Sequence, residues 1–576
     1  MRSQFVLRIR ILVGIIVVVT LAILVKLYIV QIIEGDNYKR LAQEQYVRSS
    51  YGIFDRGSIY FTEKSGKLYA AASLNGGYFM AIHPSQIKDS REVYQRLQKY
   101  IELDEDTFLA RANKVDDPYE EVAEHIDKET AKKIIKENIT GVSLFREQWR
   151  YYPGSTTASH ALGYVGYGAE GKVERGQYGL ERYWDSVLNR KEDKMHVNVF
   201  AEIIANARDV LTFNEHEREG SVVTSIDPVV QLELERALYD AQEEWNAKHL
   251  GGIIINPKTG AIYALGALPT FNPNNYGDTK DIQVFRNPFV ENVYEMGSII
   301  KPIAMAIALD EGVVTAETTY NDKGYIELDT FTISNYDGKA RGVVNMQEVL
   351  SQSLNVGMAY VAEEVGGVVI GRRMREFGFG EETGIDLPFE VRGLIDNLNE
   401  ETVLKRKVEY ATAAFGQGIA LTPIATVRAL GALGNGGYLT TPHFVTDLQF
   451  DAGGEAHVAP DDRVQVLKPE TSEEITRMLV EVVDTALKGG TVKKERYSIA
   501  AKTGTAQIAK EGERGYYDDR YLHSFFGYFP AYDPEFLIFL YHVEPQGARY
   551  ASETLTDPFM DIVDFLINYY HIPPDR

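Results

Sequence analysis

The N-terminal part of the chain carries one long apolar segment. Between residues 11 and 33 the only charged side chain is Lys26. An apolar run of this length can cross a bilayer as a helix, and a lysine near one end can extend its ammonium group to the interface. Arginines precede the run, and no small-x-small cleavage site follows it. We therefore predict an uncleaved transmembrane anchor in residues 1–35, with the N-terminus in the cytoplasm and the bulk of the chain outside.

The next region, residues 36–215, alternates short apolar runs with turns and charged helices. It opens with DNYKRLAQEQYVRSS, which is typical of an amphipathic helix, and it contains KETAKKIIKEN, another expected helix. No cluster of potentially catalytic side chains stands out in it. We expect a non-catalytic module here.

The remaining region, residues 216–576, mixes strand and helix patterns. SVVTSIDPVVQLELERALYDAQEEW predicts a strand, a turn at Asp227-Pro228 and a long amphipathic helix, and GGIIINPKTGAIYALGAL predicts a hairpin. Helices combined with local hairpins predict an α+β fold, in which an antiparallel sheet is flanked by helices. Further elements are expected as helices around 345–363 and 422–433 and as strands around 498–505, 523–529 and 536–542.

Composition and charge exclude several kinds of function. The 576 residues carry a net charge of −23, and no basic run with interleaved aromatic residues occurs, which argues against a nucleic-acid partner. The chain has no cysteine, so disulfides, thiolate catalysis and cysteine-ligated zinc are excluded. The 11 histidines show no metal-ligand spacing. We predict neither a metal nor another cofactor.

The clearest candidate chemistry lies in EMGSIIKPIAMAIALDEG, residues 295–312. A serine hydroxyl is a poor nucleophile until a base removes its proton. Lys301 follows Ser298 by three residues, so on a helix the two side chains share a face. Apolar surroundings would lower the pKa of this lysine and let it act as the base. The free N–H groups of a helix start can also hold a developing oxyanion.

Two further triplets follow Ser298 along the chain. Ser353-x-Asn355 lies at an expected helix start, and Lys502-Thr503-Gly504-Thr505 ends an expected strand. Ser-x-x-Lys alone is a weak signal, because about two chance matches are expected in a chain of this length. In this order, however, Ser-x-x-Lys, Ser-x-Asn and Lys-Thr-Gly are the set of serine β-lactamases and penicillin-binding proteins.

The side chains of this set have complementary chemistry. The Ser353 hydroxyl can relay a proton between the two lysines and a leaving amine, and Asn355 can hold a substrate amide. The two threonines offer hydroxyls to a substrate carboxylate, which the charge of Lys502 also attracts. Gly504 lets a backbone or a substrate approach the strand closely. The candidate catalytic residues are Ser298, Lys301, Ser353, Asn355 and Lys502, and the candidate substrate-binding residues are Thr503, Gly504 and Thr505.

Two similar sequences are interpreted as structural. Lys258-Thr259-Gly260 lies in the predicted hairpin turn and supplies turn residues. Ser85 and Lys88 form a second Ser-x-x-Lys spacing in the membrane-proximal part, without ordered partner motifs. We expect the Ser85–Lys88 pair at the surface.

The chain resembles the class B penicillin-binding proteins, the monofunctional peptidoglycan transpeptidases with a single membrane anchor. The resemblance covers roughly residues 10–570 and goes well beyond the three triplets. Segments similar to boxes of the family's N-terminal module are GIFDRGSIY, RYYPGSTTASHALGYVG and GLERYWDSVL. Segments similar to boxes of its transpeptidase domain are TSIDPVVQ, NPKTGAIYALGALPTFNPN, FGFGEETGIDLP, AFGQGIALTPIATVRALGALGNGG and HSFFGYFPAYDP.

This resemblance implies an organisation and a reaction. Residues 1–35 would be a short tail and anchor, 36–215 an elongated pedestal of the dimerisation type, and 216–576 the penicillin-binding transpeptidase fold. Ser298 would attack the penultimate D-alanine carbonyl of a stem peptide ending in D-Ala-D-Ala and pass the acyl group to an amine on a neighbouring stem. The backbone N–H groups of Ser298 and Thr505 would form the oxyanion hole. β-Lactam antibiotics would acylate the same serine.

The resemblance also implies partners and a location. In the family, a polytopic glycan polymerase of the membrane is the usual partner, and divisome or elongation-complex proteins would surround the pair. The chain would be a single-pass protein of a bacterial cell membrane. The segment DRYLHSFFGYFPAYDPEFLIFLYHVEPQG is closer to septal, cell-division members than to elongation-type members.

The sequence departs from the family pattern at two places. Met296 precedes Gly297 where the family usually has proline, which costs turn rigidity but no chemical group. The family's Asp-Arg-Asn-Gly box reads Asp55-Arg56-Gly57-Ser58, which concerns the pedestal and not catalysis.

Four alternatives share parts of this pattern. The anchor and pedestal argue against a serine β-lactamase, and the absence of glycosyltransferase features before residue 215 argues against a bifunctional class A enzyme. The intact catalytic set argues against a non-enzymatic β-lactam sensor or scaffold. A D,D-carboxypeptidase, which hands the same acyl group to water, stays open.

Overall fold

The computed structural model describes residues 18–21, 23, 26, 28, 54–114, 117–167, 174–190, 219–510, 512, 513 and 515–576. Most of the predicted anchor and all of the amphipathic helix expected at 36–50 lie outside the described residues. Within the part that is described, no helix combines the length and the apolar character needed to cross a membrane.

The described chain forms two compact units. Residues 76–149 belong to the smaller unit, and residues 56–75, 150–190 and 219–576 belong to the larger one. The larger unit therefore includes two stretches of the N-terminal module expected from the sequence. Its own strand pairing explains this, because β1 (Ile59–Thr62) runs parallel to β7 (Gly220–Thr224).

The smaller unit packs three helices on strands. The later part of β2 (Leu68–Ile82) pairs with β3 (Glu120–Ile126) and β4 (Val142–Tyr151). Each helix begins after an aspartate whose carboxylate accepts from backbone N–H groups of the first turn, which satisfies donors that the helix leaves free. The helices are α3 (Ser90–Leu97), α4 (Glu105–Ala112) and α5 (Lys128–Glu137), after the short turn η2 (Pro84–Gln86). Their apolar faces close a core that includes Met80, Ile82, Leu97, Phe108 and Ile134.

The first part of the larger unit is a small sheet with short helices. β7 pairs with β15 (Val445–Phe450), which pairs with β16 (Glu455–His457), and β1 pairs with the start of β2. Nearby elements are α6 (Ser159–Leu162), β5 (Val165–Tyr167), β6 (Glu174–Gly176), α7 (Gly179–Tyr183) and α8 (Asp185–Leu188).

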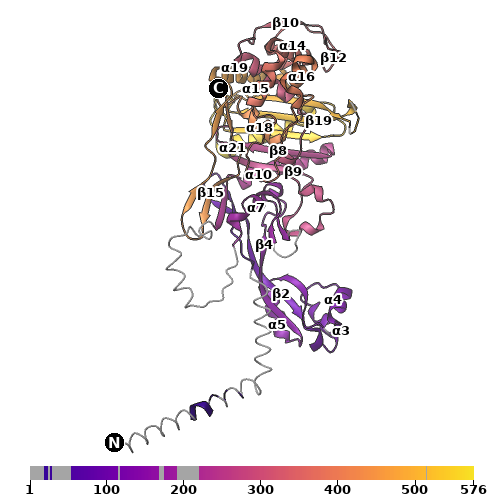
Figure 1. Ribbon diagram of the computed structural model, residues 1–576, viewed down its shortest axis with the longest axis vertical. Helices are drawn as coiled ribbons and strands as arrows, with labels where there is room; N and C mark the ends of the chain where they lie inside the picture. Colours follow the sequence, from indigo (N-terminus) through magenta and orange to yellow (C-terminus); the bar gives the residue numbers. More distant parts are fainter. Residues whose placement is uncertain are drawn as a thin grey trace, which may run out of the picture. The chain divides into compact units, whose positions relative to one another are not determined.

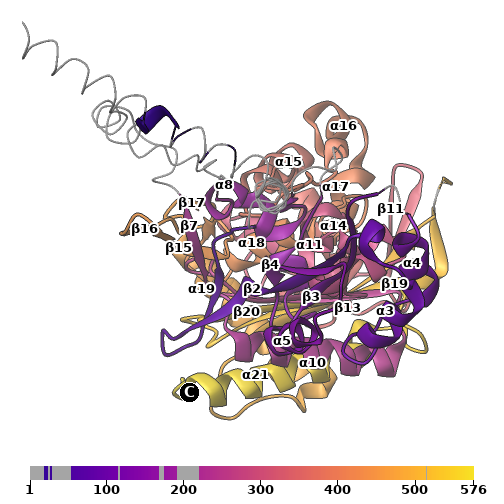
Figure 2. The same ribbon diagram turned by 90° about the horizontal axis from the view of Figure 1, so that it is seen from below.

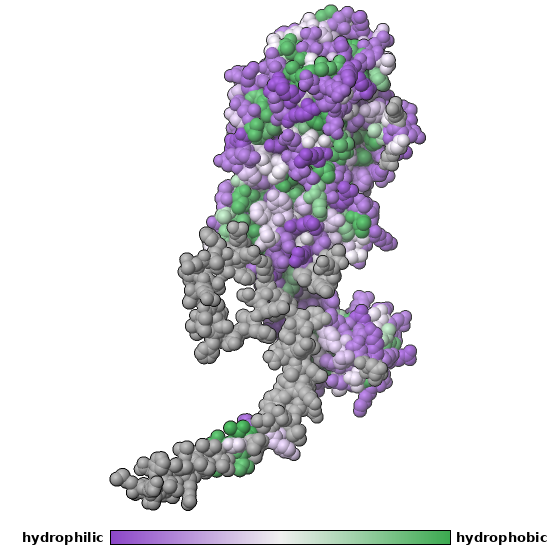
Figure 3. Space-filling model, in the orientation of Figure 1, coloured by the Kyte–Doolittle hydropathy of each residue, from purple (hydrophilic) through white to green (hydrophobic). Residues whose placement is uncertain are grey.

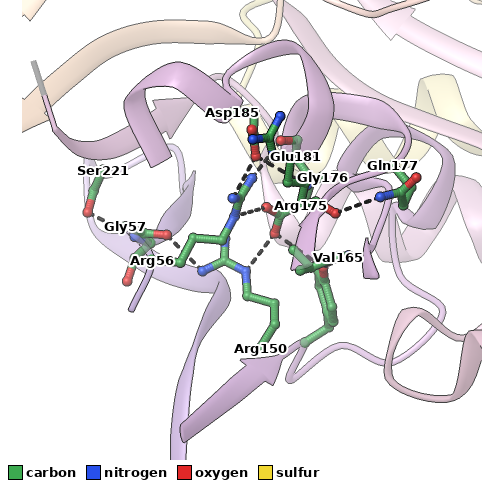
Figure 4. Close-up of polar contacts among 12 residues, drawn as sticks. Arg56, Gly57, Arg150, Val165, Arg175, Gly176, Gln177, Glu181, Asp185 and Ser221 are labelled. Carbon is green, nitrogen blue, oxygen red and sulfur yellow. Dashed lines mark hydrogen bonds and ion pairs between the residues drawn. The ribbon is translucent and has the colours of Figure 1, made fainter. Parts of the chain in front are cut away.

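A buried ionic network ties these elements together. Figure 4 shows the guanidinium groups of Arg56 and Arg150 pointing at the carboxylate of Glu181. The Nε atoms of Arg56 and Arg150 lie 2.7 and 2.6 Å from separate Glu181 oxygens, and Arg56 Nη1 lies 2.7 Å from Asp185. Arg150 also donates to the carbonyl of Gly57 over 2.7 Å. Segments more than 100 residues apart in sequence are thus joined by charge.

The main feature of the larger unit is a five-stranded antiparallel sheet in the order β18-β19-β20-β8-β9. β20 (Phe536–Val543) is buried at every position, as expected for a central strand covered on both faces. β18 (Ala500–Ala509) is an edge strand of this sheet. The other three strands are β8 (His249–Ile255), β9 (Ile262–Leu268) and β19 (Tyr516–Phe529).

Two helices cover one face of this sheet. Figures 1 and 2 show α10 (Pro228–Trp245) and α21 (Thr556–Tyr570) side by side against the strands. α10 begins where its sequence predicts, since the Asp227 carboxylate accepts from the N–H groups of Val229 and Val230 and Pro228 opens the first turn. The apolar faces of the two helices pack on the sheet and form a continuous core with it. The short helix α20 (Ala551–Thr554) precedes α21.

A larger helical layer covers the other face. α12 (Lys301–Asp310) lies at its centre and is buried from Lys301 to Ala308, which explains why its sequence is apolar on all sides. Around it lie α13 (Met346–Ser351), α14 (Asn355–Val365), α15 (Gly367–Glu376), α16 (Glu400–Lys405), α17 (Lys407–Ala413), α18 (Pro423–Gly431) and α19 (Pro469–Glu481). The larger unit presents a mixed, mainly hydrophilic surface in the view of Figure 3.

Short hairpins and turns complete the larger unit. Three two-stranded antiparallel sheets are present: β10 (Thr319–Asp322) with β13 (Gly342–Asn345), the hairpin of β11 (Tyr325–Leu328) and β12 (Phe331–Ser334), and β14 (Tyr438–Thr440) with β17 (Arg463–Gln465). The turns and short helices are η5 (Pro273–Asp278), η6 (Ile282–Phe285), α11 (Pro288–Glu291), η7 (Gly297–Ile300), η8 (Asp396–Leu398), η9 (Val482–Ala486) and η10 (Leu487–Gly490).

These elements confirm the predicted α+β class, with an antiparallel sheet between helical layers. The predicted hairpin at 251–268 and the three predicted C-terminal strands are present. The helix expected over 345–363 is wrong in one respect. The chain leaves the helix between Ser351 and Asn355, because Ser353 adopts a left-handed conformation with φ of 56°.

Candidate active site

The candidate nucleophile lies on a tight turn between the helical layer and the sheet. η7 runs directly into α12, and Gly297 opens it with φ of 64°, a conformation that favours glycine. The N–H of Gly297 donates to the carbonyl of Gly416 over 3.1 Å, and the Ser524 hydroxyl donates to the carbonyl of Met296 over 2.9 Å. These contacts fix the backbone on both sides of the turn. Ser298 is half-buried and faces the cleft described below.

Lys301 lies one turn after Ser298 and is fully buried. Its Nζ donates to the Ser353 carbonyl over 2.5 Å, to the Ser353 hydroxyl over 3.2 Å and to Asn355 Oδ1 over 2.8 Å. The Asn355 amide nitrogen donates to the carbonyl of Ser334 over 3.1 Å. Both ends of the Asn355 amide are therefore engaged within the protein, and this residue holds the lysine in place.

Ser353 lies where the chain leaves one helix before it enters the next. Its left-handed backbone is uncommon for a residue other than glycine, and such conformations occur where the surrounding structure imposes them. The break turns the Ser353 carbonyl and hydroxyl toward Lys301. The same hydroxyl receives a hydrogen bond from Lys502 Nζ over 3.1 Å. One hydroxyl thus bridges two lysines.

The electrostatics of this pair favour the uncharged amines. Burial, together with the neighbouring charge of Lys502, holds the pKa of Lys301 well below its ordinary value. Burial lowers the pKa of Lys502 to about 7. The oxygens that accept from the two Nζ atoms belong to carbonyl, hydroxyl and amide groups, all of them uncharged. A buried amine with such neighbours can take up a proton from a hydroxyl.

The edge strand β18 forms the opposite wall. A Cβ at Gly504 would lie 2.4 Å from the Ser524 hydroxyl oxygen and 2.8 Å from the carbonyl oxygen of Met296, so only glycine lets the nucleophile turn approach the strand. A Cβ at Gly297 would also lie 3.1 Å from the backbone carbonyl of Thr505, so the turn passes close to the strand here as well. The Thr505 hydroxyl accepts from the N–H of Ala551 over 3.0 Å, which leaves its own proton free to donate.

Six of the eight residues predicted from the sequence line one cleft of about 720 Å³, namely Ser298, Ser353, Asn355, Lys502, Thr503 and Thr505. Lys301 lies behind Ser353, and Gly504 lies beneath the nucleophile turn. The structure thus brings together three motifs that are 50 to 150 residues apart in sequence.

Several cleft residues escaped the sequence analysis. Glu348 lines the cleft from α13, and Arg549 and Tyr550 line it just before α20. The rings of Tyr336 and Tyr550 meet edge to face, with centroids 5.9 Å apart. These residues belong to loops and helix ends without a recognisable motif, so only the fold reveals that they share the cleft.

Glu295 supports the nucleophile turn from behind. Its Oε1 accepts from the Tyr516 hydroxyl over 3.1 Å and from the N–H of Gly418 over 3.2 Å. Burial raises the pKa of this carboxyl, and the two donors partly offset that effect. Glu295 thereby links the turn to the loop that contacts Gly297 and to the start of β19.

The two motifs interpreted as structural lie away from the cleft lining. In Lys258-Thr259-Gly260, two backbone N–H groups donate to Asn256 Oδ1 and Gly260 has φ of 86°, which confirms the turn. Ser85 and Lys88 are exposed in the smaller unit, as predicted. Within the described ranges, no group of three or more acidic or histidine side chains could hold a metal ion.

Comparison with protein families gives two matches. Residues 251–563 match the Penicillin binding protein transpeptidase domain, and residues 55–217 match the Penicillin-binding Protein dimerisation domain. The first match alone covers more than half of the chain, and it contains every residue of the candidate site.

Comparison with characterised proteins and solved structures agrees. The chain is 29% identical to Stage V sporulation protein D of Bacillus subtilis, over 94% of this chain and 82% of that protein. It is 29% identical to the Peptidoglycan D,D-transpeptidase FtsI homolog of Mesostigma viride, over 86% of this chain and 85% of that protein. Penicillin Binding Protein 2X of Streptococcus thermophilus shares the fold, with a TM-score of 0.70 at 20% identity over 90% of this chain and 80% of that one.

Proposed function

Because the chain belongs to the penicillin-binding protein transpeptidase family, we propose that it is a peptidoglycan D,D-transpeptidase that works through a serine acyl-enzyme. The substrate is a stem peptide ending in D-Ala-D-Ala, and β-lactams acylate the same serine. The observation that carries the proposal is the Ser353 hydroxyl, which lies within 3.2 Å of Lys301 and 3.1 Å of Lys502 in the cleft that Ser298 faces.

The first step is attack by Ser298 on the penultimate D-alanine carbonyl. Lys301, one turn along and with a pKa that burial lowers, takes the proton of the Ser298 hydroxyl. This assignment is supported by the fixed position of the amine, which three hydrogen bonds to Ser353 and Asn355 hold at the Ser353 motif. Backbone N–H groups of Ser298 and Thr505 stabilise the oxyanion, which is supported by the small space between Gly297 and Thr505, where a Cβ at Gly297 would lie 3.1 Å from the Thr505 carbonyl.

Proton return uses the bridging hydroxyl. When the bond to the terminal D-alanine breaks, its amine needs a proton. Ser353 donates its own and is replenished from a lysine on either side. Lys502, with a pKa of about 7, holds a proton for part of the time near neutral pH and can supply it.

The edge strand binds the carboxylate of the terminal D-alanine. Thr505 has a free hydroxyl proton because its oxygen already accepts from Ala551, and Thr503 and Lys502 lie on the same strand. Gly504 contributes by letting the nucleophile turn approach the strand.

We further propose the cellular setting. Residues 1–35 anchor the chain in the membrane with the N-terminus in the cytoplasm, residues 36–215 form the non-catalytic pedestal, and residues 216–576 carry the reaction outside. A glycan polymerase of the membrane and other cell-wall assembly proteins are the expected partners. The names of two relatives, which refer to sporulation and to FtsI, favour a septal role over an elongation role.

Labelling with fluorescent benzylpenicillin tests the proposal. The purified full-length chain should form one covalent adduct, and peptide mapping should place that adduct on Ser298. Ser298→Ala should abolish labelling, whereas Ser85→Ala, in the exposed second Ser-x-x-Lys spacing, should label like the wild-type protein. Labelling that persists in Ser298→Ala would refute the assignment.

A further inference from the structure

The side chains that line the cleft include charged groups of both signs, and the positive and negative groups come from different elements. Lys502 and Arg549 line it from β18 and from the segment before α20. Glu348 lines it from α13, the helix that ends two residues before Ser353. Among the described residues that line the cleft, Glu348 is the only carboxylate. A lone acidic group in a cleft with several cations calls for a specific explanation.

Helix capping does not account for the Glu348 carboxylate. The N–H of Glu348 donates to Asn345 Oδ1 over 3.0 Å, so Asn345 satisfies the helix start. The carboxylate itself accepts a short hydrogen bond from the side-chain amide of Gln352. Within the described part of the chain, no lysine or arginine lies within ion-pairing distance of Glu348, whereas the neighbouring Lys488 is paired with Asp557 over 2.6 Å.

Gln352 orients this carboxylate. Arg341 Nε donates to Gln352 Oε1 over 2.8 Å, and Arg341 is itself held by Asp337. Because arginine can only donate, the amide oxygen of Gln352 must face Arg341 and its NH₂ group must face Glu348. The NH₂ group donates to Oε1 of Glu348, and Oε2 receives no hydrogen bond from the described residues. Glu348 thus lines the same cleft as Ser353 with one carboxylate oxygen held by Gln352.

We propose that Glu348 forms the subsite for the acceptor amine of the transpeptidation reaction. The inference rests on the proposed function, because only a reaction with an amine acceptor requires such a subsite. A primary amine is mostly protonated in water near neutral pH, and a carboxylate attracts it through a charge-assisted hydrogen bond. The threonines of β18 hold the carboxylate of the donor peptide, so the two substrates bind to different walls of the cleft.

The acceptor step then proceeds with balanced bonds and protons. The bound ammonium loses one proton to solvent and becomes a free amine. The amine nitrogen attacks the acyl carbon, and the new C–N bond forms as the bond from that carbon to Ser298 Oγ breaks. The second proton of the amine passes through Ser353 to the departing Ser298 oxygen. Glu348 acts as a binding and positioning group, and the lysines and Ser353 handle the protons of the reacting atoms.

The test compares two acceptors on Glu348→Gln. The full-length chain in detergent is acylated with a D-alanyl thioester donor, and mass spectrometry measures how the acyl group divides between water and added acceptor. Glycinamide is mostly a cation near neutral pH, and hydroxylamine is mostly uncharged. We expect the concentration of glycinamide needed for half-maximal transfer to rise about tenfold, since one charge-assisted hydrogen bond is lost. The hydroxylamine reaction should keep its wild-type concentration dependence.

A matched control separates charge from folding. Glutamine suits the same helix position, and thermal unfolding should verify that Glu348→Gln folds. Glu364→Gln, on the exposed surface of α14, removes the same charge outside the cleft and should leave both acceptors unaffected. Equal losses with both acceptors, or no loss with either, would overturn the subsite. If the wild-type chain forms no acyl-enzyme with thioester or penicillin, the proposed function fails, and the subsite with it.

Discussion

Two buried clusters of ionisable side chains in the larger unit differ in how their surroundings affect the charged form. In the network around Glu181, two guanidinium groups meet one carboxylate, and Asp185 supplies further negative charge. Burial alone would raise the pKa of Glu181, but the charges of Arg150 and Arg56 outweigh it and hold the pKa below its ordinary value. In the cleft, Lys301 and Lys502 share uncharged partners, and the pKa of each amine is lowered.

The difference distinguishes charged groups that hold the fold together from ionisable groups that suit proton transfer. The Glu181 network keeps its members ionised, so their charges hold distant segments together, and removing one would leave the others without compensation. The lysine pair lies where burial lowers the pKa of both amines, which disfavours their charged forms and suits them to proton transfer. Four substitutions test this contrast.

The largest effect is expected on activity at Lys301. Lys301→Met keeps the length and apolar character of the side chain but removes the base, so penicillin acylation should fall about a thousandfold. The free energy of unfolding should not fall, since a buried amine that disfavours its charged form is replaced by an apolar group. Stopped-flow acylation and urea denaturation measure the two quantities. A large loss of stability with retained acylation would reverse the roles of the two clusters.

The converse is expected at Glu181. Glu181→Gln leaves Arg150 without its counter-charge and Arg56 with Asp185 alone, so the free energy of unfolding should drop by about 3–5 kcal/mol. Molecules that remain folded should acylate at the wild-type rate, because the network is not part of the cleft lining. The control is Glu401→Gln, in an exposed ion pair with Lys405, which should cost less than about 1 kcal/mol. Similar losses in the two variants would contradict the structural role of the network.

A substitution at Gly504 changes geometry without changing charge. Its new methyl group would meet the Ser524 hydroxyl and the carbonyl of Met296, so Gly504→Ala should cost about 1–3 kcal/mol of stability and displace Ser298 from the edge strand. Acylation should slow while the pH dependence of the remaining activity stays unchanged. Acylation at the wild-type rate would show that the approach of turn and strand is not required.

The smallest effect is a slope against pH at Lys502. Its pKa is about 7 in the folded protein and 10.5 ordinarily, so between these values the unfolded chain binds more protons and stability rises with pH. Lys502→Met should remove this contribution, which is at most about 1.4 kcal/mol per pH unit. Glu181 affects stability in an acidic pH range instead. Its lowered pKa stabilises the folded protein above the ordinary value of 4.5, and this stabilisation is lost as the pH falls below that value. Denaturation curves at several pH values measure both, and parallel curves for Lys502→Met and wild type would refute the lowered pKa.

Sequence patterns predicted the elements whose start, end or turn depends on residues within or next to them. The hairpin at 251–268 has its turn residues inside it, and α10 has its capping aspartate directly before it. The three motifs of the candidate site were also accessible, because each combines residue types that the proposed chemistry requires at short spacing. Their convergence on one cleft is consistent with the order in which they occur.

Features that depend on distant partners were not accessible. The sequence predicts a helix start at Ser353-x-Asn355, but nothing in SQSLN signals that Ser353 itself adopts a left-handed backbone with its carbonyl toward Lys301. Arg56 and Glu181 are 125 residues apart, and no local pattern pairs them. Glu348 reads as an ordinary first-turn glutamate until the fold places it in the cleft.

The division of the chain into two units affects the order in which its parts can fold during synthesis. The core of three helices and their strands in the smaller unit lies within residues 76–149, so these elements can pack together as soon as that stretch has emerged. Ser58, by contrast, bonds to Ser221, 163 residues later, and β1 must wait with an unpaired edge until β7 arrives. Domains generally fold in the order of their synthesis, and a strand with an unpaired edge can pair with a wrong partner. Chaperone binding to the nascent chain is therefore expected to concentrate on the stretch around β1, and to end only when residues near 220 have been synthesised.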